Sequence, residues 1–261
     1  MSGFDFTGCS ALITGASAGI GREFARQLAG RAGSLVLVAR RSDRLEELRD
    51  ELMRKDPNLN VHCRAVDLSQ PNEINDLIAW LSDSGIAIDF LINNAGLGDR
   101  GTFATAEPGR IQQMLAVNIV ALTMLTRALL PAMIAARRGA ILNVSSTAGF
   151  LPIRKMAVYA ATKAYVTNFS DGIRGEVRKQ GIVVTSLCPG PVDTEFGSVA
   201  RRSSGKQPVP SPSFMHVAVE DVVRAGLSAV ERNKALVVPG IVMKIAMVLV
   251  RLTPLAILRR V

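Results

Sequence analysis

The chain has 261 residues, of which 48% are hydrophobic, and it carries a formal net charge of +9. This length fits one α/β domain whose core needs no disulfide or metal, and the apolar fraction excludes an intrinsically disordered chain. The positive charge would suggest a nucleic acid or an anionic membrane as partner, but six basic residues and no acidic residue lie in 232–261. The first 231 residues therefore carry only +3.

Cysteine and histidine are sparse in this chain. Cys9, Cys63 and Cys188 are far apart and form no CxxC pair, and His62 and His216 have no partner at the spacing of metal ligands. We therefore expect neither a disulfide framework nor a metal site. The first residues lack the basic and apolar regions of a signal peptide, so the sequence predicts a cytoplasmic protein.

Apolar runs typical of buried strands alternate with helical patterns along the chain. The predicted strands are 10–14, 34–39, 61–66, 89–92, 140–145 and 182–188. The predicted helices are 20–28, 43–53, 71–81, 111–136, in which Pro131 is expected to end or kink the helix, and 158–180. This alternation indicates a doubly wound parallel α/β sheet. No linker divides the chain, so we expect 1–261 to form a single domain, with 197–213 as an irregular loop.

A glycine-rich segment joins the first predicted strand to the first predicted helix. It reads TGASAGIG over 14–21, with Gly15, Gly19 and Gly21 at the junction. Free N–H groups and the positive end of the helix dipole attract anions at such a junction, and glycines let a pyrophosphate approach closely. The segment therefore predicts a phosphate-binding loop.

The same segment also contains the G-x-S-x-G pattern of a hydrolase nucleophile. Ser17 would be the nucleophile, and Asp193 and His216 would be its partners. The hydrolase pattern normally follows several strands, whereas this one follows the first. The phosphate-binding interpretation is therefore favoured.

A second group of polar residues carries the chemistry. Tyr159 and Lys163 are four residues apart in a predicted helix, so both lie on one face. A cation beside a phenol lowers the phenol pKa, which is ordinarily about 10, and lets tyrosine exchange protons near neutral pH. Ser146 follows a predicted strand thirteen residues before Tyr159. Because the carboxyl ends of parallel strands share one crevice, we expect these residues to meet the glycine loop.

Together these segments resemble the short-chain dehydrogenase/reductase family. The resemblance covers nearly the whole chain and rests on TGASAGIG (14–21), NNAG (93–96), the asparagine of VNI (118), NVSS (143–146), YAATK (159–163) and CPGPVDT (188–194). It implies a Rossmann fold, a nicotinamide cofactor and hydride transfer between the cofactor and a carbonyl or alcohol.

The resemblance implies a role for each of four catalytic residues. Tyr159 would be the general acid in reduction or the base in oxidation, and Ser146 would hydrogen-bond the substrate oxygen. Lys163 would hold the nicotinamide ribose and lower the pKa of Tyr159. Asn118 would anchor a water in a proton relay behind Lys163.

The resemblance also implies a cofactor site. Its residues would be Gly15, Ser17, Gly19, Ile20, Gly21, Arg40, Arg41, Asp67, Leu68, Asn94, Ala95, Gly96, Tyr159, Lys163, Pro189, Gly190, Val192 and Thr194, with Asn93 also beside the adenosine ribose. The second predicted strand ends in Arg40 and Arg41, without the acidic residue that usually binds the ribose of NAD. Because a guanidinium can bind a 2′-phosphate in bidentate fashion, we predict NADP rather than NAD, with Arg40 as the main contact.

Three segments are expected to set substrate specificity: 149–156, 194–216, which corresponds to the variable lid of the family, and the tail 241–261. The candidate lining residues are apolar, namely Phe150, Leu151, Phe196, Phe214 and Met215. They favour a hydrophobic ketone, a 3-oxoacyl compound or a steroid-like molecule over a sugar.

The tail 241–261 places Lys244, Arg251 and Arg259 on one helical face among apolar residues, and Pro254 interrupts the helix. This charge makes a membrane-spanning helix a poor match. Two interpretations stay open. The favoured one buries the apolar side in the subunit interface of a homodimer or homotetramer, or over the substrate pocket. The other is peripheral contact with an anionic membrane surface.

The sequence thus predicts an NADP-dependent carbonyl reductase or alcohol dehydrogenase with a small-molecule substrate. The alternative is a cofactor-sensing regulatory protein on the same fold, which would have no need of the four catalytic residues. A nucleic-acid partner is not expected, because the chain has only two Tyr and one Trp and no known binding motif.

Overall fold

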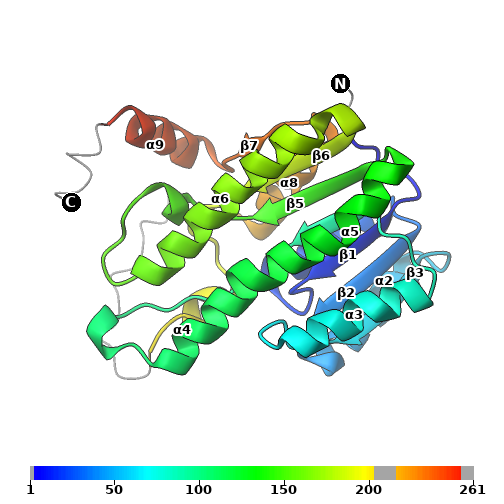
Figure 1. Ribbon diagram of the computed structural model, residues 1–261, viewed down its shortest axis with the longest axis horizontal. Helices are drawn as coiled ribbons and strands as arrows, with labels where there is room; N and C mark the ends of the chain where they lie inside the picture. The colour runs from blue at the N-terminus through cyan, green and yellow to red at the C-terminus, as the bar shows by residue number, and fades with distance from the viewer. Residues whose placement is uncertain (1–2, 203–215, 254–261) are drawn as a thin grey trace.

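The computed structural model describes residues 3–202 and 216–253. In this part of the chain seven parallel strands form one sheet in the order β3-β2-β1-β4-β5-β6-β7 (Figure 1). The strands are β1 (Ser10–Thr14), β2 (Ser34–Ala39), β3 (Asn60–Ala65), β4 (Phe90–Asn93), β5 (Gly139–Val144), β6 (Ile182–Leu187) and β7 (Leu236–Val237). The strand order reverses between β1 and β4, which confirms the predicted doubly wound Rossmann fold.

Helices cover both faces of this sheet. One core cluster joins it to α1 (Gly19–Leu28), α2 (Ser42–Lys55) and α8 (Val219–Glu231). The other joins it to α3 (Pro71–Asp83), α5 (Leu122–Ala136) and α6 (Ala157–Val177). The remaining helical elements are η1 (Phe103–Thr105), α4 (Pro108–Leu115), η2 (Ala116–Ala121), η3 (Thr147–Phe150), η4 (Arg178–Gln180), α7 (Glu195–Val199) and α9 (Ile241–Leu252). Because both faces are covered, each central strand is apolar on both sides, as its sequence indicated.

The long predicted helix at 111–136 is composite. It begins with α4, passes through the π-helical turn η2 and continues as α5. Pro131 lies inside α5, so the expectation that it could end the helix is wrong, and a kink at Pro131 stays a prediction. Leu125 and Met133 on either side of Pro131 are buried against the sheet, and this packing offsets the lost backbone hydrogen bond. By length and composition Pro108–Ala136 could also cross a membrane, but helices that cover a sheet pass the same test.

Other differences from the predicted elements are local. β3 begins and ends one residue earlier than predicted, and residues 178–180 form the separate turn η4. The five-residue helix α7 covers part of the segment that was expected to be irregular. The sequence patterns also missed α8 and the short edge strand β7. Most of the predicted lid, including Phe214 and Met215, and the chain after residue 253 lie outside the described residues.

Candidate active site

The glycine-rich segment passes from β1 into α1 along a path that needs residues without side chains. Gly15 has a φ of 69°, in the left-handed region. A Cβ atom on Gly21 would lie 2.3 Å from the carbonyl oxygen of Gly15. α1 begins at Gly19 with no side-chain hydrogen bond at its N-cap and no acidic residue in its first turn. The N–H groups of this turn therefore suit a phosphate.

Asn94 holds the glycine-rich segment from the adjacent strand end. Its Nδ2 donates to the carbonyl oxygen of Thr14 at 2.9 Å, and its backbone N–H donates to Thr14 Oγ1 at 3.0 Å. Asn93 was expected beside the adenosine ribose, but it is buried, and its Nδ2 donates to Asn143 Oδ1 at 2.9 Å. That expectation is wrong, because successive side chains of an extended segment point to opposite faces and only Asn94 reaches the cavity.

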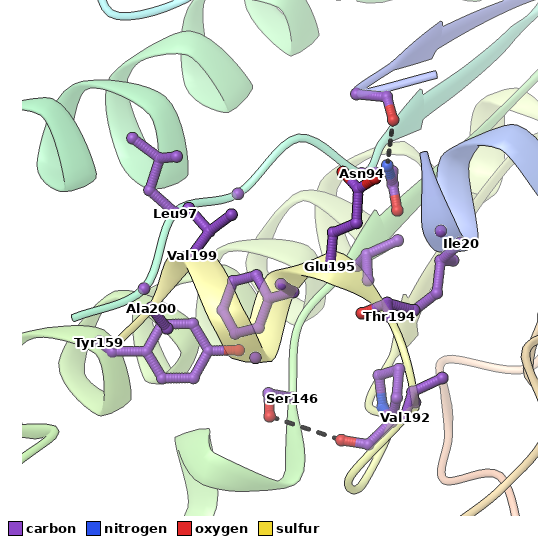
Figure 2. Close-up of a pocket in the computed structure, with 18 of the residues that line it drawn as sticks. Ile20, Asn94, Leu97, Ser146, Tyr159, Val192, Thr194, Glu195, Val199 and Ala200 are labelled. Atoms are coloured by element: carbon purple, nitrogen blue, oxygen red, sulfur yellow. Dashed lines mark hydrogen bonds between the residues drawn. The ribbon is translucent and has the colours of Figure 1, made fainter. Parts of the chain in front are cut away.

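A cavity of about 1080 Å³ lies along the carboxyl ends of the central strands. It gathers every predicted catalytic and cofactor-binding residue except Gly21, Asn93 and Asn118, and Figure 2 shows part of this lining. The predicted residues that line it are Gly15, Ser17, Gly19, Ile20, Arg40, Arg41, Asp67, Leu68, Asn94, Ala95, Gly96, Ser146, Tyr159, Lys163, Pro189, Gly190, Val192 and Thr194. This volume is in the range of sites that enclose a large ligand.

Gly21 and Asn118 do not line the cavity but contact segments that do. Gly21, at the end of the glycine-rich segment, packs closely against the backbone at Gly15. Asn118 lies in the π-helical turn, where its Oδ1 accepts from the N–H of Leu97 at 2.8 Å. Its Nδ2 donates to the carbonyl oxygen of Leu97 at 2.9 Å and to Thr162 Oγ1 at 3.0 Å. The side chain thus ties the segment after β4 to α6, and a part in a proton relay stays a prediction.

The candidate catalytic side chains meet at one end of the cavity. Tyr159 and Ser146 both line the cavity, and Figure 2 shows the Ser146 hydroxyl donating to the carbonyl oxygen of Pro189, at 3.4 Å. Lys163 Nζ lies 5.8 Å from the centre of the Tyr159 ring and donates to the carbonyl oxygen of Val144 at 2.8 Å. The Ser145 hydroxyl instead donates to the carbonyl oxygen of Lys163 at 2.8 Å. This geometry favours Ser146 over Ser145 as the contact to a substrate oxygen.

Burial controls the proton affinities of these groups. Desolvation raises the pKa of Tyr159 to about 12, and the nearby Ser146 hydroxyl only partly opposes the rise. Desolvation also lowers the pKa of Lys163 to about 8. We expected Lys163 to lower the pKa of Tyr159. In the protein without cofactor the pKa of Tyr159 is raised instead, because the phenol is buried.

Two arginines stand at the opposite end of the cavity, after β2. Arg40 is exposed and lines the cavity. Arg41 Nη2 donates to Ser17 Oγ at 3.2 Å, and Arg41 Nη1 lies 3.0 Å from Glu195 Oε2. The guanidinium groups and the glycine-rich segment suit an anionic dinucleotide. No sequence pattern pointed to Glu195, because its contact with Arg41 spans distant parts of the chain.

The Tyr159 end of the cavity has apolar walls. The Phe196 ring from α7 lies 5.4 Å from the Tyr159 ring, centre to centre. Leu151 and Phe196 line the cavity as predicted, whereas Phe150 lines a smaller neighbouring pocket. Further apolar lining comes from Leu97, Ile153, Met156, Met243, Ala246 and Met247. The last three belong to α9, so the first turns of the tail form part of the site.

The family of the chain follows from comparison with known proteins. The model of the short chain dehydrogenases matches residues 10–204. The chain belongs to the short-chain dehydrogenase/reductase family. This agrees with the resemblance in the motifs and with the crevice in which they meet.

Individual members of this family are similar along most of the chain. A very-long-chain 3-oxoacyl-CoA reductase of Bos taurus is 31% identical over 217 residues, which are 81% of this chain and 68% of that protein. A sulfoacetaldehyde reductase of Chromohalobacter salexigens is 38% identical over 205 residues, which are 75% of this chain and 76% of that protein. A short-chain dehydrogenase from Sphingobium yanoikuyae in complex with NADPH has a TM-score of 0.81 and 31% identity, covering 94% of each chain.

Membership of this family argues against the alternative in which Ser17, Asp193 and His216 form a hydrolase triad. The geometry of these residues argues against it as well. His216 Nδ1 lies 2.8 Å from Asp193 Oδ1, as a triad would need, but the Asp193 side chain is 85% exposed. A triad uses a buried acid to orient its histidine. The hydroxyl of Ser17 instead accepts a hydrogen bond from Arg41 at the arginine-lined end of the cavity.

Proposed function

We propose that the protein is an NADP-dependent oxidoreductase that transfers hydride between the nicotinamide and a carbonyl or secondary alcohol. The observation that carries this proposal is that one cavity is lined both by arginines with a glycine-rich loop and by Tyr159 with Ser146. The NADPH in the solved structure of the Sphingobium yanoikuyae relative supports the choice of cofactor. When bound, the nicotinamide supplies or accepts the hydride.

The side chains of the site bind the substrate oxygen, transfer the proton and hold the cofactor. The Ser146 hydroxyl hydrogen-bonds the substrate oxygen, and the Tyr159 hydroxyl gives that oxygen a proton in reduction or removes one in oxidation. Lys163, whose Nζ donates to the carbonyl oxygen of Val144, would hold the nicotinamide ribose, and its charge would favour the phenolate of Tyr159. Phe196 shields the Tyr159 ring from water.

The alternative of a cofactor sensor predicts binding without turnover. NADPH consumption in the presence of ketones, 3-oxoacyl esters and steroids, followed by absorbance, separates the two functions. Carbonyl-dependent consumption supports an enzyme, whereas cofactor binding without consumption supports a sensor.

The mouth of the cavity favours a substrate that joins an apolar part to an anionic group. Arg100 and Arg201 line the cavity and are partners in a parallel bridge, so their side chains start side by side. The nearby Asp99 carboxylate pairs with Arg202 and Arg110. Among the described residues, no carboxylate forms an ion pair with Arg100 or Arg201. Two guanidinium groups that pair with no carboxylate of the described residues, beside apolar walls, suit a 3-oxoacyl compound with an anionic tail.

Relatives support this substrate class, because the names of two of them specify anionic carbonyl compounds. One reduces a 3-oxoacyl-CoA, which bears phosphates, and the other reduces sulfoacetaldehyde, which bears a sulfonate. Within the substrate classes that the sequence allowed, the 3-oxoacyl class fits both the apolar walls and the arginines.

We expect the double variant Arg100→Ala, Arg201→Ala to lower kcat/KM for an anionic ketone by about tenfold to a hundredfold, because each charged contact contributes about 1 kcal/mol or more. For a neutral ketone of similar apolar size, kcat/KM should stay within about twofold. Arg224→Ala on α8, where Arg224 pairs with Asp221, is the control. Equal losses for both ketones would rule out an anion contact at the mouth.

We also propose that the chain forms a homo-oligomer and that α9 is one of its contact surfaces. Met243 and Met247 face the protein, while the opposite face of α9 exposes large apolar side chains. The exposed ones are Ile241, Val242, Ile245, Val248, Leu249 and Leu252. An apolar patch of this kind is rare on a monomer surface, so we expect a second copy of the chain to cover it.

Removing 241–261 tests this surface. We expect the mass in solution, measured by analytical ultracentrifugation, to fall from that of a dimer or tetramer toward a smaller species. Co-sedimentation of the full chain with anionic vesicles is the parallel assay. An unchanged mass, combined with vesicle binding that disappears on truncation, would instead assign the surface to a membrane.

A further inference from the structure

A carboxylate from the substrate side of the cavity reaches the cationic end of the cofactor cleft. Glu195 is the first residue of α7, and Figure 2 shows its side chain directed from α7 toward Asn94. One oxygen, Oε2, lies 3.0 Å from Arg41 Nη1, and the other, Oε1, lies 2.5 Å from Arg44 Nη1. The carboxylate therefore pairs with two guanidinium groups at once.

The surroundings of this carboxylate match those expected for the 2′-phosphate of NADP. Arg41 also donates to Ser17 Oγ in the glycine-rich segment at 3.2 Å, and Arg40 lines the cavity beside it. Arg44 and Arg41 hold the pKa of Glu195 below its usual range, so the carboxylate is ionised at neutral pH. An anion of this chain thus occupies cations that a bound phosphate would need.

The ion pairs of Glu195 are weak enough to be displaced. The side chain of Glu195 is 47% exposed and that of Arg41 is 43% exposed, and ion pairs between exposed side chains contribute little to stability. A phosphate dianion forms stronger bidentate contacts with a guanidinium than a single carboxylate does. NADP(H) could therefore displace Glu195, whereas NAD(H), which has no 2′-phosphate, leaves the pairs intact.

We propose that Glu195 is a cofactor-specificity residue, whose carboxylate competes with the 2′-phosphate of NADP(H) for Arg41 and Arg44. The inference rests on the proposed function. Each NADP(H) molecule that binds must break the two ion pairs or accept a carboxylate beside its phosphate, and either lowers the affinity. Glu195 thereby narrows the preference for NADP(H) over NAD(H) that the arginines create.

The test is the Kd of the whole chain for NADPH and for NADH, measured by fluorescence titration. We expect Glu195→Gln to lower the Kd for NADPH by about tenfold, because the variant removes a negative charge that repels the 2′-phosphate and leaves Arg41 and Arg44 without this carboxylate partner. The Kd for NADH should change by less than about twofold. Glu231→Gln removes another arginine-paired carboxylate, on α8, and should change neither Kd.

A double-mutant cycle identifies the competing group. If Glu195 acts through Arg41, the effect of Glu195→Gln on NADPH should shrink to less than about threefold in an Arg41→Ala background. An unchanged or higher Kd for NADPH in Glu195→Gln would overturn the role of Glu195, as would an equal fall for both cofactors. If the wild-type chain binds neither cofactor, the proposed function fails and this inference falls with it.

Discussion

We expect Tyr159→Phe to lower carbonyl-dependent NADPH consumption by about a thousandfold and to leave the Kd for NADPH within about twofold. The substitution removes only the hydroxyl that would exchange a proton with the substrate oxygen. The ring that packs against Phe196 remains, so the cavity should keep its shape. Initial rates by absorbance and fluorescence titration of NADPH measure the two quantities.

The second tyrosine of the chain offers a matched control. Tyr165 lies in the same helix, and its hydroxyl is hydrogen-bonded with Thr123 Oγ1 at 2.9 Å, outside the cavity lining. Tyr165→Phe removes the same atom and should leave the rate within about twofold. Residual activity above about a tenth of the wild-type rate in Tyr159→Phe would contradict the role of Tyr159 as proton donor.

We expect Arg40→Asp to shift the ratio of the Kd values for NADPH and NADH by about a hundredfold toward NADH. The change removes a cation that can bind the 2′-phosphate and adds an anion that repels it. NADH should bind at least as well as before, because a carboxylate at the end of this strand can accept from a ribose hydroxyl. Fluorescence titration of both cofactors gives the ratio.

Arg54→Asp is the control for this charge reversal. Arg54 lies in the last turn of α2, away from the cavity lining, so the same change of net charge should leave the ratio nearly constant. Equal ratios in Arg40→Asp and wild type would exclude Arg40 as a phosphate contact. Arg41 would then be the next candidate, because it already binds Ser17 in the glycine-rich segment.

Most of the fold could be predicted because its signals are local. Apolar runs located β1, β2, β4, β5 and β6, and four-residue apolar spacing located the main helices. β7 was missed because it has only two residues and depends on pairing with the end of β6. Pro131 does not end α5, because packing of Leu125 and Met133 against the sheet outweighs the local tendency of proline to end a helix.

The parts of the site that could not be predicted depend on contacts between distant segments. The motifs identified the residues that line the cavity. The hydrogen bonds between Asn118 and the backbone of Leu97 depend on the π-helical turn, which no sequence pattern predicted. The ion pairs of Arg41 and Arg44 with Glu195 join residues that are more than 150 positions apart in the sequence. Burial of Tyr159, which sets its pKa, is equally a property of the assembled fold.

The most direct test of the whole account is the rate at which the full chain consumes NADPH with a 3-oxoacyl thioester as substrate, compared with Tyr159→Phe. We predict carbonyl-dependent NADPH consumption by the wild-type chain and almost none by the variant, with both binding NADPH. Tight NADPH binding by the wild-type chain without consumption for any member of the carbonyl panel would contradict the account and indicate a cofactor sensor.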